Sequence, residues 1–241
     1  MDTIKINRNV KMVAHRGLSG ILQENTIPAF EMAANKSYFG IETDVHVTKD
    51  NKYIICHDDS VLRVCGIDLI IEETNFEDLR KLSIFNKDGS INHDMHLPTL
   101  EEYITICNTH NKIAVLELKN AMKVDNILEI VGIVKKLNHY AKTIFISFSD
   151  LNIINLKKNF ADINCQFLID INTPEKKEYA FKLAKEYKVD LDLFFGPVEK
   201  SFVDLCHEND IKINVWTVDD LTKANELVDM GVDFITSNII E

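Results

Sequence analysis

The feature that most constrains this chain is a regular alternation between short apolar runs and longer stretches with helical periodicity. The short runs are rich in Val, Ile and Phe, and the alternation continues from about residue 10 to the end of the 241-residue sequence. Repeated βα units of this kind build a parallel sheet, because each helix carries the chain back to begin the next strand in the same direction. The sequence therefore predicts an α/β protein.

Eight of the apolar runs are predicted to be barrel strands. They lie at 11–15, 40–45, 113–118, 143–147, 165–169, 189–194, 212–216 and 232–236. Helices are predicted at 26–35, 100–108, 125–137, 150–159, 174–187, 200–208 and 219–230. Eight strands with interleaved helices in a chain of 241 residues are typical of a (β/α)8 TIM barrel. A doubly wound open sheet is the second choice, because it usually needs fewer strands.

One interval, from 46 to 112, is far longer than a βα connection requires. Within it, 53–57 is predicted to be an extra strand beside the second barrel strand, and 76–82 a short helix. Long excursions in barrels usually stand at the end that carries the site. We therefore predict a single barrel domain, 1–241, with a small insertion at about 58–98 between the second strand and the following helix. Little chain follows the last strand, so the N-terminal segment is expected to help close the barrel.

Composition excludes several classes of protein. A formal net charge of -11 without a basic stripe argues against nucleic-acid binding. No run approaches the roughly 18 apolar residues of a membrane-spanning helix, and the N-terminus lacks the apolar core of a secretory signal. A cytoplasmic protein without integral membrane association is therefore expected, as either a monomer or a homodimer. The five cysteines show no CxxC spacing, which predicts reduced thiols.

Carboxylates occur in pairs at predicted strand ends. Glu42 and Asp44 are two residues apart on a strand, so they point to the same face, where two like charges need a cation. Glu117 ends the next barrel strand beside Lys119, where a plain salt bridge is equally open. The all-oxygen set without a cysteine favours Mg²⁺ or Ca²⁺ over zinc. His46 is expected to pack or to face solvent rather than to bind the ion.

Two histidines are placed for proton transfer on a phosphate ester. His15-Arg16-Gly17 ends the first strand and combines a proton-transfer group, a guanidinium that can bind two phosphate oxygens, and a residue that permits a sharp turn. His57-Asp58 ends the predicted extra strand and brings a second imidazole. Two histidines on opposite sides of phosphorus can serve the nucleophile and the leaving group.

Two further features have more than one interpretation. Glu24, Asn25 and Thr26 precede a predicted helix, and a capping role for Asn25 or Thr26 is favoured over a place in the site. Trp216 ends a predicted strand at the barrel mouth. Core packing and a wall against a glycerol or choline group both remain open for it.

As an ordered set, these motifs resemble those of the glycerophosphodiester phosphodiesterases. His-Arg-Gly, Glu-Asn-Thr, Glu-x-Asp, His-Asp, Leu-Pro-Thr-Leu, Glu-Leu-Lys and Val-Trp-Thr follow one another between about 11 and 237. The resemblance implies a (β/α)8 barrel with an inserted segment. It also implies hydrolysis of a small-molecule glycerophosphodiester to sn-glycerol 3-phosphate and an alcohol.

The resemblance assigns a role to each matching residue. It makes His15 and His57 the general acid/base pair, and Arg16 and Lys119 the phosphate contacts. The ligands of one divalent cation, Mg²⁺ or Ca²⁺, would be Glu42, Asp44 and Glu117. The chain departs from many relatives after the last strand, where Thr236-Ser237-Asn238 replaces Thr-Asp with a nearby Pro. This departure concerns the geometry of the mouth and the substrate preference.

Two alternatives remain open. A phospholipase D-like enzyme that cleaves lysophospholipid or sphingomyelin would need an exposed apolar surface beside the mouth. Ile67, Leu69, Ile70 and Ile71 of the insertion could form that surface or a small local core. A non-catalytic barrel that binds a phosphorylated metabolite would be marked by loss of a histidine or a carboxylate of the set, and all of them are present.

Overall fold

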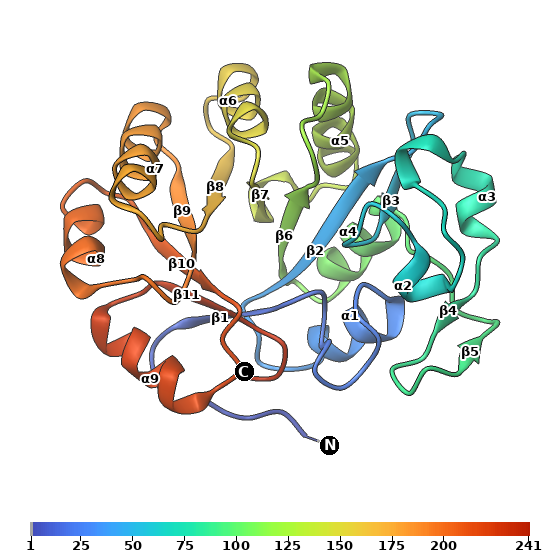
Figure 1. Cartoon of the computed structure of the whole chain (residues 1–241), viewed down its shortest axis with the longest axis horizontal. Coiled ribbons are helices and arrows are strands. Elements are labelled where there is room, and N and C mark those ends of the chain that lie inside the picture. The colour runs from blue at the N-terminus through green and yellow to red at the C-terminus, as the bar shows by residue number, and fades with distance from the viewer. Residues whose placement is uncertain (1) are drawn as a thin grey trace.

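In the computed structural model, which describes residues 2–241, parallel strands close into a barrel with helices on the outside (Figure 1). The barrel strands are β1 (Lys11–Ala14), β2 (Gly40–Val47), β6 (Ile113–Leu118), β7 (Thr143–Ser147), β8 (Asn164–Ile169), β9 (Asp190–Phe194), β10 (Ile213–Trp216) and β11 (Phe234–Ser237). They follow the order β1-β11-β10-β9-β8-β7-β6-β2, and β1 pairs with β2 to close the ring. The predicted TIM barrel is confirmed, and the open doubly wound sheet is wrong.

Five of the seven helices that the described chain places around the barrel begin at a residue whose side chain caps the helix. They are α1 (Ile27–Ala34), α4 (Leu100–Thr109), α5 (Val124–Lys136), α6 (Asp150–Asn159), α7 (Pro174–Tyr187), α8 (Lys200–His207) and α9 (Leu221–Met230), with a short 3-10 turn, η2 (Tyr140–Lys142), before β7. The two exceptions are α5 and α8. Thr26 caps α1 by accepting a hydrogen bond from the Ala29 amide. Thr99 and Glu102 form a reciprocal capping box at the start of α4. Such caps satisfy amides that have no partner within the helix, so they define where each capped helix begins.

Alternate residues of the barrel strands have different surroundings. Residues such as Leu116 and Phe145 belong to the main core, which includes the inner faces of the helices. Their sequence neighbours on the opposite face form a small cluster of strand residues inside the barrel, namely Val13, Val115, Ile146 and Leu168. The interior therefore has an apolar layer, and the polar side chains of the site stand above it at the strand ends.

The long interval between β2 and α4 contains several short elements. β3 (Tyr53–Ile55) pairs with β2 as predicted; the pairing is antiparallel, and the strand ends two residues before the predicted end at 57. It is followed by α2 (Leu62–Cys65), the 3-10 turn η1 (Ile71–Glu73), α3 (Phe76–Arg80), β4 (Ile84–Phe85) and β5 (Ile91–Asn92). β4 and β5 are each two residues long and pair with each other antiparallel. This pairing was not predicted, because strands this short have no detectable periodicity.

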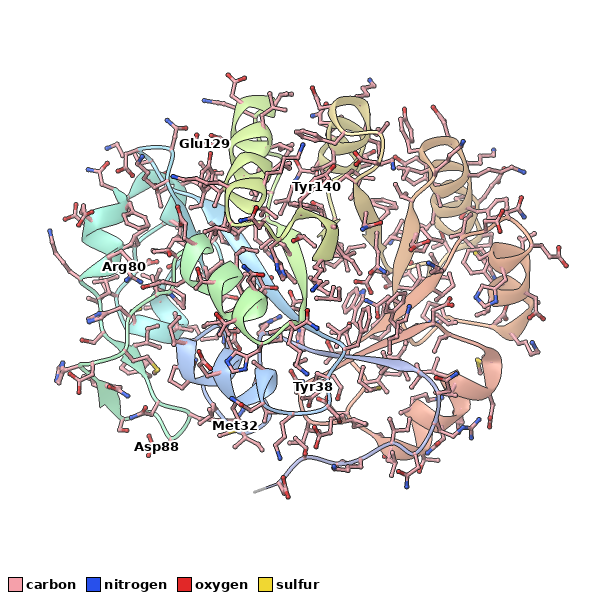
Figure 2. All side chains as sticks on the ribbon, turned by 180° about the vertical axis from the view of Figure 1, so that it is seen from behind. Met32, Tyr38, Arg80, Asp88, Glu129 and Tyr140 are labelled. Carbon is pink, nitrogen blue, oxygen red and sulfur yellow. The ribbon has the colours of Figure 1, made fainter. Side chains whose placement is uncertain are left out.

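The inserted segment has its own apolar cluster and lies at one side of the barrel, on the right of Figure 1. Arg80 of α3, labelled in Figure 2, donates to both carboxylate oxygens of Glu102 and so ties the segment to α4. We propose that residues 58–98 are an insertion within a single barrel domain.

The two ends of the described chain meet beside β11. The Ile4 amide donates to the Ile239 carbonyl at 3.1 Å, and the Ile6 amide donates to the Glu241 carbonyl at 2.9 Å. The expected contribution of the N-terminal segment to closing the barrel is confirmed. The five cysteines are buried free thiols, as predicted. Within residues 2–241, no helix is both long enough and apolar enough to cross a membrane.

The core position of Phe145 leads to a stability prediction. The Phe145→Ala change should lower the free energy of unfolding by about 3–5 kcal/mol, because the side chain is fully buried and would leave a cavity. Phe148→Ala is the matched control, since Phe148 is 50% exposed and mainly packs edge-on against Trp216. The control should cost less than about 1.5 kcal/mol. Urea unfolding of both variants tests this, and equal losses would contradict the assignment of Phe145 to the core.

Candidate active site

The carboxyl ends of the barrel strands surround a pocket of about 140 Å³. It is lined by His15, Arg16, Glu42, His57, Glu117, Ile146, Phe148, Leu168, Asp192, Trp216, Thr217 and Thr236. These residues are far apart in the sequence. They meet here because parallel strands of a barrel end at the same face.

Three carboxylates form a cluster at one side of this pocket. Glu42 and Asp44 follow one another along one face of β2, and the register places Asp44 directly beside Glu117 of β6. All three residues are buried, and one oxygen from each lies within 4.8 Å of the others. The Oδ1 atom of Asp44 has no hydrogen-bond partner within the described chain. An all-oxygen cluster with such an atom fits a hard cation such as Mg²⁺ or Ca²⁺.

The crowding of the carboxylates determines their protonation. Burial, followed by repulsion from Asp44, raises the pKa of Glu42 well above its usual value and raises the pKa of Glu117 to about 8. Burial also opposes ionisation of Asp44, but the charges of Lys119 and Arg16 outweigh it and lower the pKa of Asp44. Below about pH 8 the cluster therefore holds protons that a bound cation would displace.

Two basic side chains partly neutralise the cluster. Lys119 Nζ lies 2.9 Å from Glu117 and 3.5 Å from Asp44, while Arg16 Nε lies 3.7 Å from Asp44. Arg16 has a left-handed backbone, with φ 54, and so does Gly17, with φ 74. A Cβ on Gly17 would stand 2.7 Å from the backbone of Ala29, so only glycine fits this turn. The turn directs the Arg16 guanidinium toward the carboxylates.

His15 is oriented by the segment that follows β11. Its Nδ1 lies 2.8 Å from Oδ1 of Asn238, whose side-chain amide donates to Asp219 at 2.6 Å. Because an amide oxygen only accepts, Nδ1 of His15 carries a proton and Nε2 is left free. The departure from the family pattern at Asn238 therefore bears directly on His15, and Asp219 contributes the carboxylate from the loop before α9.

His57 is oriented from the opposite side of the pocket. Its Nδ1 lies 2.6 Å from Asp58, and Asp58 accepts hydrogen bonds from Arg63 of α2 at 2.6 Å and 3.0 Å. Arg63 also donates twice to Glu24, and Glu24 accepts a hydrogen bond from Arg16. One arginine of the insertion thus connects the carboxylate that holds Arg16 to the carboxylate that holds His57. The role of Arg63 was not predicted, because nothing in a short helix of the insertion marks a contact with the strand ends.

The expected roles of Glu24, Asn25 and Thr26 need correction. Thr26 caps α1 as predicted. Asn25 does not cap: it has a left-handed backbone, with φ 53, which turns its side chain inward to donate to Asp44 at 2.8 Å. Glu24 belongs to the Arg16 ion pairs described above. Both residues therefore contact the site, although capping was favoured. Asn tolerates the left-handed region unusually well, and this was the available signal.

The remaining predicted residues lie as follows. The Trp216 ring lines the pocket and packs on Phe148 and Phe194, with centroid distances of 5.5 Å and 5.7 Å. Its position thus combines packing with a wall of the pocket. His46 is fully buried on the same face of β2 as Glu42 and Asp44, with Nε2 3.4 Å from the His57 carbonyl oxygen, which confirms the expected packing role.

Comparison with known proteins shows extensive similarity. The sequence model described as "Glycerophosphoryl diester phosphodiesterase family" matches residues 15–241. The glycerophosphodiester phosphodiesterase of Caldanaerobacter subterraneus subsp. tengcongensis is 27% identical over 229 residues, which cover 94% of this chain and 93% of that protein.

Solved structures extend this similarity to the fold. The crystal structure of a glycerophosphodiester phosphodiesterase from Parabacteroides distasonis is 28% identical, with a TM-score of 0.79 over 95% of this chain and 93% of that one. An Oleispira antarctica phosphodiesterase, solved in complex with the product sn-glycerol 3-phosphate, has a TM-score of 0.84 at 22% identity, over 95% and 92% of the two chains. At that identity the second likeness shows the shared barrel alone.

The surroundings of His15 lead to a prediction on pH. Burial, aided by the charge of Arg16, lowers the pKa of His15 from 6.5 to about 4. The unfolded chain therefore binds the proton first as the pH falls, so stability is lost between about pH 6.5 and pH 4. In excess chelator, moving from pH 7.5 to pH 5 should cost the wild type about 2 kcal/mol more than His15→Gln. Urea unfolding at the two pH values measures this difference, and equal losses would contradict the shift.

Proposed function

The chain belongs to the glycerophosphoryl diester phosphodiesterase family, and from this premise we propose that His15 and His57 carry the hydrolysis of a glycerophosphodiester to sn-glycerol 3-phosphate and an alcohol. The observation that carries the proposal is one pocket lined by both histidines, each with Nδ1 held by a neighbour and Nε2 free. Family membership supports the broader class of phosphoric diester hydrolase on its own.

The two histidines have complementary surroundings. His15 stays neutral at pH 7, because burial lowers its pKa to about 4, so its Nε2 can accept the proton of the attacking oxygen. Asp58 stabilises the positive charge that His57 carries when both of its nitrogens are protonated. We assign His15 as the general base and His57 as the acid that protonates the leaving alkoxide. One P–O ester bond breaks, and one forms to the attacking oxygen.

The basic residues and the acidic cluster bind the phosphate in this proposal. Arg16 and Lys119 face the carboxylates at the pocket edge and would contact the phosphoryl oxygens. Glu42, Asp44 and Glu117 would hold one divalent cation, Mg²⁺ or Ca²⁺, which when bound neutralises phosphoryl charge and acidifies a nearby hydroxyl or water. Glu24 and Asn25 would orient Arg16 and Asp44 respectively through the hydrogen bonds described above.

The apolar surface of the insertion argues for a water-soluble substrate. Ile67 and Ile70 are 47% and 39% exposed, but Ile71 is fully buried and Leu69 packs against the cluster of the insertion. The insertion also exposes Leu62 and Ile91, but none of these four side chains lines the pocket, so the insertion gives the site no apolar wall for lipid chains. We therefore favour headgroup diesters over phospholipase D-like cleavage of lysophospholipid or sphingomyelin. The complete set of histidines and carboxylates disfavours a binding protein without activity.

The histidine assignment predicts a large loss of turnover. With Mg²⁺ or Ca²⁺, the wild type should release sn-glycerol 3-phosphate from glycerophosphocholine or glycerophosphoethanolamine, whereas His15→Asn and His57→Asn should lower kcat by about 10²–10⁴-fold. His93→Asn, in the insertion and away from the pocket, should leave kcat unchanged. A histidine variant with wild-type kcat would overturn the acid/base roles. Release from lysophospholipid or sphingomyelin alone would favour the phospholipase D-like alternative.

The carboxylate cluster predicts metal binding that depends on pH. Because Glu117 has a pKa of about 8 in the metal-free protein, a cation must displace protons, and the affinity for Mg²⁺ or Ca²⁺ should fall as the pH is lowered from 8 to 6. Calorimetric titration in two buffers of different ionisation enthalpy should reveal the proton release. Glu117→Gln should weaken binding at pH 8, while Glu101→Gln on α4 should not. Full turnover by the wild type in excess chelator would rule out the metal-assisted mechanism.

A further inference from the structure

The pocket is also lined by a carboxyl group that the proposed mechanism does not use. Asp192 lies on β9 between Leu191 and Leu193, both of which belong to the main core that faces the helices. Alternation along the strand therefore turns Asp192 into the barrel. It is only 2% exposed, yet it lines the same pocket as His15 and His57.

The protein itself leaves this carboxyl group without a complete set of partners. Oδ1 of Asp192 has no hydrogen-bond partner, and no lysine or arginine among residues 2–241 forms an ion pair with it. Its strand neighbours are Leu168 on β8 and Asn214 on β10. Burial raises the pKa of Asp192 well above its usual value, the charge of Glu117 adds to this shift, and Asn214 opposes it. The protonated form can both donate and accept a hydrogen bond.

A buried polar atom without a partner is costly, by about 1–3 kcal/mol in proteins. When such an atom lies in a pocket wall, a bound ligand that supplies the missing hydrogen bond removes this free-energy cost. The rest of the wall around Asp192 is largely apolar and includes Ile146, Leu168 and Trp216. This part of the pocket, with a polar anchor beside apolar walls, fits a short carbon chain that bears a hydroxyl group.

The two arms of a glycerophosphodiester differ in what they offer to Asp192. A glycerol arm carries hydroxyl groups, each of which can donate and accept a hydrogen bond. The trimethylammonium end of a choline arm has neither an N–H nor an O–H to give to the unpartnered oxygen. In glycerophosphocholine, only the glycerol arm can therefore supply the missing hydrogen bond.

We propose that Asp192 is a specificity-determining residue that hydrogen-bonds a hydroxyl group of the glycerol arm of the substrate. This inference rests on the proposed function and names the group that the interior of the pocket recognises. The Trp216 indole donates to the backbone carbonyl of Asp192 at 3.3 Å, so the aromatic wall and the carboxyl group are held together. A site built to bind a hydroxyl group rejects an analogue that lacks it, because the buried oxygen is then left unpaired.

The test compares three choline diesters, all followed by choline release with Mg²⁺ or Ca²⁺. They are glycerophosphocholine, its analogue without the terminal hydroxyl, and its analogue without the 2-hydroxyl. Asp192→Leu should lower kcat/KM for glycerophosphocholine by about 10- to 100-fold. It should cause no further loss on the analogue that already lacks the hydroxyl bound by Asp192. Asp192→Asn, which keeps a donor and an acceptor, should restore most of the discrimination.

A matched control separates this role from a general need for polarity inside the barrel. Gln166 lies on β8, two residues before Leu168 and on the same face of the strand. Its side chain is buried, and its Nε2 also has no hydrogen-bond partner. It does not line the pocket, so Gln166→Leu should leave the ratios among the three substrates unchanged. Equal losses on all three substrates with Asp192→Leu would overturn the proposal. A changed preference for choline over ethanolamine diesters, with unchanged kcat/KM ratios among the three choline diesters, would also overturn the proposal.

A binding measurement keeps the proposal falsifiable if turnover fails. Calorimetry of sn-glycerol 3-phosphate and inorganic phosphate should show that Asp192→Leu weakens the first at least 10-fold and leaves the second unchanged. Wild-type protein that binds sn-glycerol 3-phosphate in this Asp192-dependent way but hydrolyses none of the diesters would overturn the proposed function and support the glycerol site. Equal weakening of both ligands would overturn the glycerol site.

Discussion

The structure around the pocket depends on the burial of three carboxylates at neighbouring strand ends. β2 and β6 place Glu42, Asp44 and Glu117 so close together that repulsion and desolvation hold protons on the cluster. Arg16 and Lys119 offset this repulsion only in part, and their own charges are stabilised by the same carboxylates. The cluster is thus a site prepared for a cation, at the expense of local stability.

Loops and the inserted segment hold the groups that surround this cluster. Arg63 reaches from α2 to Glu24 and Asp58, which in turn contact Arg16 and His57. On the other side of the pocket, Asp219 and Asn238 orient His15. Each reactive side chain is therefore held by a neighbour that does not itself line the pocket. The barrel strands provide fixed positions, and the loops provide orientation.

Much of the fold and part of the site could be predicted because they depend on local patterns. The alternation within 40–47 and 113–118 specifies strands with one polar face, and the paired carboxylates lie on that face in the structure. Asn25, Arg63 and Asn238 could not be placed in the same way. Asn25 enters the site through a left-handed backbone, and the other two through side chains that cross between separate elements. No spacing in the sequence encodes such contacts, because they form only when the barrel closes.

The sequence by itself determined the number and order of the barrel strands, the face on which the carboxylates stand, and the membership of the family. These follow from periodicity and ordered motifs, which are properties of neighbouring residues. Only the tertiary structure decided which buried polar atoms have hydrogen-bond partners. It left Asp44 and Asp192 each with an oxygen that has no hydrogen-bond partner, and it placed the Asn238 amide against His15. The physical reason is that desolvation and hydrogen bonding depend on atoms brought together from distant strands, so they exist only in the closed barrel.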